Sequence, residues 1–220
     1  MMKLLTALTA SLLLAVPLSS IQARSDNGVM YEVTITNLTR GSLFTPILVA
    51  SHRSGVSLFA LGEPASAELA MLAEGGNVEP LAQALRADSR VVDVANSGGL
   101  LEAGQSVTVQ VAAQGADRVS LAAMIVPTND GFIALNGVEA PRSGSETHRV
   151  PGYDAGSEPN DERCASIPGP QCGGEGVSPS ASGEGFVHVH AGIHGIGDLK
   201  AEEYDWRNPV AAVTIKKTAR

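Results

Sequence analysis

The chain has 220 residues, of which 44% are hydrophobic, 17% are charged and 4% are aromatic, and its formal net charge is −8. This composition suits a globular protein of one domain or two small ones, and it excludes a chain that is disordered throughout. The acidic balance argues against a nucleic-acid-binding protein, which needs a basic face, and against electrostatic docking on an anionic membrane.

The first residues have the pattern of an export signal. Lys3 gives a positive start, and the apolar run over 4–18 is shorter than the ~20 residues of a membrane-spanning helix. Small and polar residues around Ala23 offer a cleavage point, so we expect a signal peptide over 1–23 and one mature domain over 24–220. No later run is long and apolar enough to span a bilayer, and we expect the mature protein to be secreted or periplasmic.

The mature chain begins with strand patterns and then changes period. Residues 29–36 alternate apolar and polar side chains, which predicts a strand with one buried face. Residues 43–50 are a second extended candidate, in which Pro46 indicates an edge or a bulge. Two short helical patterns, separated by a pair of glycines, then predict a helical insertion over about 64–87.

Short strand patterns resume after the insertion, separated by turns rich in Gly, Pro and Asn. They cover residues 106–111, 118–126, 132–135, 186–190 and 210–218. So many short strands with little helix predict a mainly β fold, an antiparallel β-sandwich. The exception is a loop over about 143–185, rich in Gly, Ser, Pro and acidic residues, which we expect to be functional or poorly ordered.

The chain has two cysteines, Cys164 and Cys172, and the segment between them contains Pro168-Gly169-Pro170. These residues predict a turn that brings the sulfur atoms together, and an exported protein can keep a disulfide. The alternative is a thiolate metal site, but two thiols without a second pair are a weak zinc signal. A disulfide is therefore expected.

Acidic residues gather in two turns that each lie beside a predicted strand end. Asp130 lies in the first turn, and Asp154, Glu158, Asn160 and Asp161 lie in the second. Ca²⁺ takes about six to eight oxygen ligands, so these turns would form a calcium site if they meet in space. The alternative is a pair of solvated turns, where Asp and Asn are favoured in any case.

Four stretches occur in an order typical of a known family. Residues 121–132 contain a (M/L)-x-x-P-(S/T)-x-D turn, residues 153–158 a D-A-G-(T/S)-(D/E) turn, and residues 208–215 a closing V-A-x-V-x-I strand. Residues 59–76 are similar to a helical insertion. Together they resemble the spondin N-terminal domain family, of the F-spondin and mindin type, from about Tyr31 to Ile215.

The resemblance implies a C2-like β-sandwich that binds calcium through Asp130, Asp154 and Glu158. Glu158 stands where animal members have Asp, and its longer side chain would change the geometry. Animal members are matrix and adhesion proteins with further domains, whereas this chain resembles the compact single-domain version that bacteria export. We therefore expect a calcium-binding module for adhesion or for the cell envelope, whose extracellular or envelope partner the sequence does not identify.

A second group of candidate ligands is formed by His188, His190 and His194. On a strand His188 and His190 share one face, as a pair that binds Zn²⁺ or Cu²⁺ requires. A transition-metal-binding protein or a metal-dependent enzyme is thus the alternative function, with Glu184 or Asp198 as a supporting partner. The competing interpretation is a polar strand face whose rings bond to backbone carbonyls.

The sequence lacks the known catalytic signatures. It has no G-x-S-x-G elbow, no H-E-x-x-H, no P-loop and no dinucleotide-binding fingerprint. The single Trp, Trp206, lies in an acidic and aromatic stretch, where we expect it to cover the end of the sandwich. We expect a protein that is not an enzyme.

Overall fold

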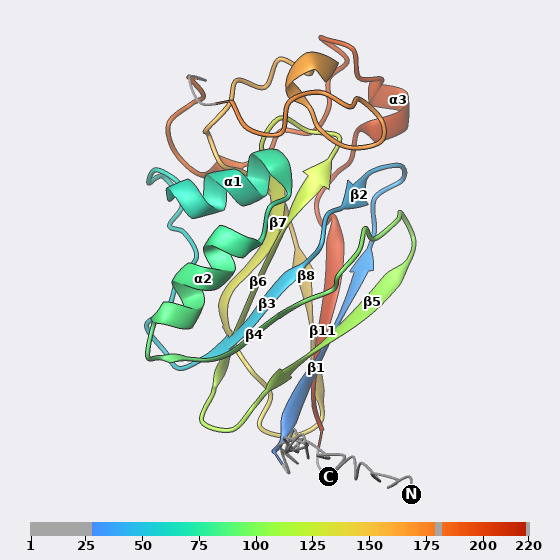
Figure 1. The fold of residues 1–220 in the computed structure, drawn as a ribbon. Coiled ribbons are helices and arrows are strands. Elements are labelled where there is room, and N and C mark those ends of the chain that lie inside the picture. Colours follow the sequence, from blue (N-terminus) through green and yellow to red (C-terminus); the bar gives the residue numbers. More distant parts are fainter. Residues whose placement is uncertain (1–27, 179–181, 219–220) are drawn as a thin grey trace, which may run out of the picture.

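The computed structural model describes residues 28–178 and 182–218, so the expected signal peptide over 1–23 lies outside the described residues. Strands account for 35% of the described residues and helices for 13%. The strand pairs are antiparallel and form two sheets that pack face to face (Figure 1). The predicted fold class, a mainly β antiparallel sandwich, is confirmed.

The first sheet has the strand order β5-β1-β11-β8. Tyr31, Val33 and Ile35 of β1 are buried on its inner face, while Thr34 points outward and shares a 2.8 Å hydrogen bond with Thr108 of β5. The alternation read from residues 29–36 therefore marks the inner and outer faces of this sheet. The strands are β1 (Met30–Asn37), β5 (Ser106–Ala112), β8 (Ser145–Val150) and β11 (Ala211–Thr218).

The second sheet has the order β10-β9-β7-β6-β3-β4, and a short strand, β2, also pairs with β6. Its central strands are buried along most of their length because both of its faces are covered, one by the first sheet and one by helices. The strands are β2 (Leu43–Phe44), β3 (Leu48–His52), β4 (Val91–Asn96), β6 (Arg118–Val126), β7 (Gly131–Glu139), β9 (Gly152–Asp154) and β10 (His188–Val189).

The helical insertion expected over 64–87 forms two helices, α1 (Ala67–Gly75) and α2 (Glu79–Ala87), on the outer face of the second sheet (Figure 1). Ser66 caps α1, because its side chain accepts a hydrogen bond from Leu69 N, and Gly76 ends it in the left-handed conformation. Leu69, with its helical neighbours, packs against Leu48 of β3 and Phe132 of β7 in a second apolar core.

The long loop expected over 143–185 begins later than the sequence suggested. Strands β8 and β9 occupy residues 145–150 and 152–154, and the next strand begins at His188. Between them, a short 3-10 helix, Cys164–Ser166, is the only helix or strand among the described residues 155–178 and 182–187. β8 escaped detection because it is an edge strand with mostly exposed residues and no apolar alternation.

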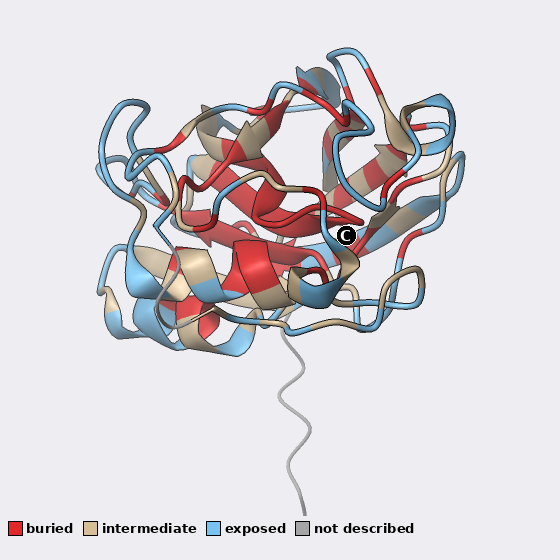
Figure 2. Ribbon diagram, turned by 90° about the horizontal axis from the view of Figure 1, so that it is seen from above, coloured by how far each residue is buried: buried red, intermediate tan, exposed pale blue. Residues whose placement is uncertain are grey.

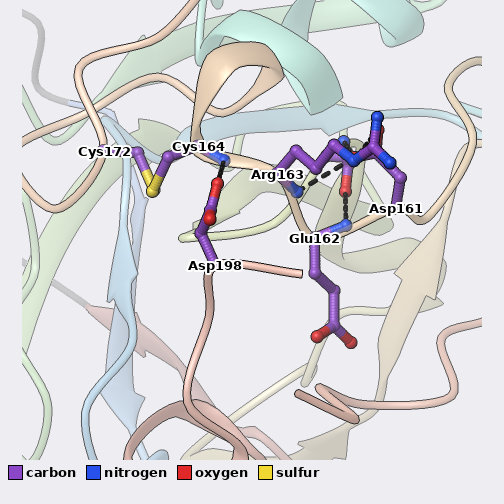
Figure 3. Close-up of a disulfide and its surroundings, with 7 residues drawn as sticks. Asp161, Glu162, Arg163, Cys164, Cys172 and Asp198 are labelled. Carbon is purple, nitrogen blue, oxygen red and sulfur yellow. Dashed lines mark hydrogen bonds and ion pairs between the residues drawn. A yellow bond between two sulfur atoms is a disulfide. The ribbon is translucent and has the colours of Figure 1, made fainter. Parts of the chain in front are cut away.

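Residues 155–178 and 182–187 close the upper end of the sandwich together with residues 190–205, which include the short helix α3 (Ala201–Tyr204). Seen from that end, buried strand segments lie inside a border of exposed loops (Figure 2). The expected disulfide between Cys164 and Cys172 is present, and Asp198 accepts a 2.9 Å hydrogen bond from the Cys164 amide (Figure 3). Among the described residues, no helix has the length and apolar character to cross a membrane.

Candidate metal centre

The two acidic turns of the sequence meet at the upper end of the sandwich. Asp154 ends β9, which pairs with β7 so that Asp154 lies opposite Gly131, the residue after Asp130. The Ala155 amide donates to the Asp130 carbonyl at 3.2 Å, which continues this pairing beyond the strand. The expectation that the turns lie together is therefore met for Asp130 and Asp154, and both residues are fully buried.

Asp130 is held by the second turn through one of its two carboxylate oxygens. Its Oδ2 accepts hydrogen bonds from the backbone amides of Ser157 at 2.7 Å and Glu158 at 3.0 Å, and from the Ser157 hydroxyl at 3.2 Å. Its Oδ1 is buried and has no hydrogen-bond partner among the described residues. A buried carboxylate oxygen without a partner is costly, and it is available to a cation.

Asp154 receives a different set of donors. Its Oδ1 accepts from the Gly156 amide at 2.8 Å, and its Oδ2 accepts from the Asn160 side chain at 2.7 Å. Gly156 has a positive φ of 66°, and a Cβ at this position would clash with the backbone of Phe186. The D-A-G sequence therefore requires glycine for both its conformation and its close contact with the returning chain.

Glu158 is buried beside the same turn, but its carboxylate is not grouped with those of Asp130 and Asp154. Both of its oxygens are buried without a hydrogen-bond partner among the described residues, and the acidic neighbours that act on it are Glu74 and Asp161. The structure thus attaches Glu158 to Asp130 through its backbone amide, while its side chain lies near α1.

Burial is the main cause of the pKa shifts of the three acidic residues Asp130, Asp154 and Glu158. Loss of hydration, followed by the charge of Asp154, raises the pKa of Asp130 to about 7. Burial is also the main cause that raises the pKa values of Asp154 and Glu158. Carboxyl groups with raised pKa values resist ionisation unless a cation compensates the charge, so the cluster fits a divalent ion.

The remaining predicted oxygen ligands divide between the two sides of the turn. Asn160 reaches Asp154, and Asp161 instead accepts a 3.2 Å hydrogen bond from the Asn129 side chain and bonds the Arg163 amide. Asp161 therefore has partners that fix the loop. Asn160 is the member of this pair that lies at the Asp130–Asp154 site.

The histidines lie beside the same carboxylates. His188 pairs with Asp154 in the β10–β9 register, and the distance between His188 Nε2 and Asp154 Oδ1 is 3.4 Å. His190 Nε2 lies 3.9 Å from Asp154 Oδ2, so the two rings share one face as the strand period predicted. His194 is exposed, and its backbone amide is bonded to the carboxylate of Glu162.

Two further acidic residues contribute to this end of the molecule, and the sequence indicated only the first of them. Glu184 lies 3.8 Å from His188 Nε2, and the sequence suggested it only as a supporting partner. Glu162 is buried, and its carboxylate accepts three backbone amides, those of residues 194–196, at 2.6 to 2.9 Å. Glu184 lies only four residues before His188, whereas Glu162 acts across loops that are distant in the chain, so no local sequence pattern marks Glu162.

The fold and the site together define a class of protein: an antiparallel β-sandwich whose acidic turns lie at one end. The family model described as Spondin_N matches residues 36–158, more than half of the chain, and the chain belongs to this family. The predicted resemblance is thereby confirmed. A comparison with curated proteins finds no match.

Proposed function

We propose that this protein is an exported calcium-binding β-sandwich module that acts in adhesion or at the cell envelope, outside the cytoplasm. The observation that carries the proposal is the buried Asp130 carboxylate beside Asp154, whose Oδ1 has no hydrogen-bond partner among the described residues. Oxygen atoms of this kind are the ligands that Ca²⁺ takes in proteins. The disulfide and the family membership agree with export.

Asp130 and Asp154 would hold the ion, and the family resemblance adds Glu158. A bound divalent cation would supply positive charge that compensates two buried carboxylates, one at the end of β9 and one in the turn before β7. Because Ser157 and Glu158 already bond Asp130, an ion held there would tie the loop after β9 to the turn between β6 and β7. Its role in this proposal is to order a binding surface, and no catalytic step is involved.

Calcium binding is tested by titration calorimetry of the EDTA-treated protein. Asp130→Asn keeps the side-chain size and removes the charge, so we expect its calcium affinity to fall by at least about tenfold, which corresponds to ~1.4 kcal/mol. Asp117→Asn is the matched control, since exposed Asp117 precedes the nine-residue strand β6 and lies roughly 30 Å from Asp130. Equal affinities for the wild type and Asp130→Asn would refute the assignment.

A further inference from the structure

Beside the carboxylate pair lies a group of mixed chemistry that a calcium site does not require. Asp154, Glu184 and His188 each offer one ligand atom, and the three atoms lie within 4.8 Å of one another. Glu184 and His188 come from the returning segment after residue 182, outside the stretch matched by the family model. Only Asp154 is common to this group and to the proposed calcium site.

The hydrogen bonds of His188 decide which of its nitrogens is free. Its Nδ1 lies 3.1 Å from the Val189 carbonyl oxygen, which can only accept, so Nδ1 carries the proton. Its Nε2 faces the carboxylates of Asp154 and Glu184, at 3.4 and 3.8 Å, where it donates when the ring is an imidazolium and offers a lone pair to a cation when the ring is neutral. Nε2 is buried and makes no hydrogen bond to either one among the described residues.

In the neutral ring the lone pair of Nε2 lies beside two carboxylates, and a cation between the three groups would stabilise this arrangement. Zn²⁺ bonds to imidazole nitrogen and carboxylate oxygen are about 2.0–2.2 Å long, which places two tetrahedral ligand atoms about 3.4 Å apart. The observed distances of 3.4 and 3.8 Å are close to this spacing. Phe186 packs against the His188 ring, with ring centres 5.3 Å apart, and so restricts its orientation.

His190 and His194 do not belong to this group of ligands. His190 Nδ1 accepts a 2.9 Å hydrogen bond from the Gly192 amide, so its neutral ring carries the proton on Nε2, the atom that faces Asp154. That nitrogen has no lone pair for a metal. His194 is exposed and is not a member of the group.

We propose that Asp154, Glu184 and His188 form a binding site for a transition-metal ion of the Zn²⁺ type. Glu184 and His188 are partly exposed, with 39% and 27% of their side chains accessible, so the ion would be reached from solvent. Three protein ligands leave a fourth position for water or for a group of a partner. Asp154 would be shared by the two sites if calcium is also bound.

The test is a zinc titration of the EDTA-treated protein in excess Ca²⁺, in competition with a chromophoric zinc chelator. We expect one equivalent of Zn²⁺ per chain, and at least about a tenfold loss of affinity in each of His188→Ala and Glu184→Gln. His194→Ala, the matched histidine control, should bind as the wild type does. Circular dichroism verifies that the variants are folded, and Co²⁺ spectra of the wild type should show imidazole coordination that His188→Ala lacks.

Several results would overturn the proposal. A wild type that binds no Zn²⁺ would mean that the three groups form an ion pair only, and unchanged affinity in His188→Ala would mean that the ion binds elsewhere. Asp130→Asn separates the two sites, because it should lose Ca²⁺ and keep Zn²⁺. Loss of Zn²⁺ in that variant would assign zinc to the carboxylate pair and refute the ligand set given above.

Discussion

Asp130 lies in an environment that disfavours its ionised form. Its pKa in the folded protein is about 7, raised from 3.8 by burial and then by Asp154. The folded state therefore keeps a proton that the unfolded state releases, and this costs stability as the pH rises from about 4 to about 7. Burial lowers the pKa values of His52 and His190. Their unfolded forms therefore bind more protons, so these two residues increase the stability as the pH rises over the same range.

The contribution of Asp130 is isolated by comparing the wild type with Asp130→Asn in EDTA. The difference in the free energy of unfolding, variant minus wild type, should increase between pH 4.5 and 7.5 by on the order of a few kcal/mol, because only the wild type carries the titrating carboxyl group. Urea denaturation at each pH measures this difference. A difference that does not change with pH would show that Asp130 titrates normally.

Gly156 is the second residue on which the site depends. Gly156→Ala introduces a strained positive φ and a clash with the Phe186 backbone, so we expect a loss of about 2 kcal/mol or more in stability. Gly62→Ala is the control, because Gly62 also has a positive φ, of 83°, but has open space around its Cβ position. Equal losses in urea denaturation would mean that the contact with Phe186 contributes nothing.

At the scale of elements, the two loops of the upper end are joined mainly through one side chain. Glu162 bonds the amides of residues 194–196, and its carbonyl accepts the Asp198 amide at 2.8 Å. The disulfide lies on the same segment (Figure 3). The loop after β9 is thus fixed by chain contacts in addition to any ion, and charge-assisted bonds of this kind are stronger than neutral ones.

Removal of the Glu162 charge should loosen this end of the molecule. Glu162→Gln replaces an oxygen by a donor and leaves backbone amides unpaired, so we expect a loss of about 2 kcal/mol in stability and faster proteolysis near residues 190–200. Glu175→Gln, at an exposed position in the same loop, should be neutral. If both variants resist protease as the wild type does, Glu162 does not hold the loops together.

For the whole molecule, the sequence predicted the elements that have one buried face. The strand at 29–36 and the helical insertion were recognised because their apolar spacing follows the period of a strand or a helix. β8 and the half-exposed β4 were missed because no apolar alternation marks them. The sandwich itself followed from the number of short strands.

Only those parts of the candidate site that belong to a sequence motif could be predicted from the sequence. The resemblance placed Asp130 and Asp154 together, and the strand period placed His188 and His190 on one face. The position of Glu184 and His188 beside Asp154 depends on how the long loop returns, and the proton on His190 Nε2 depends on a single backbone hydrogen bond. Neither can be derived from residue spacing.

Calcium binding at the buried carboxylates is tested by thermal unfolding of the wild type. The midpoint is measured in EDTA and in excess Ca²⁺ or Mg²⁺. A ligand at about 100 times its dissociation constant adds ~2.7 kcal/mol. For a chain of this size the midpoint should rise by roughly 5–10 °C. We predict this rise with Ca²⁺, a smaller one with Mg²⁺, and none with Ca²⁺ in Asp130→Asn. An unchanged midpoint of the wild type in excess Ca²⁺ would show that the buried carboxylates do not bind calcium.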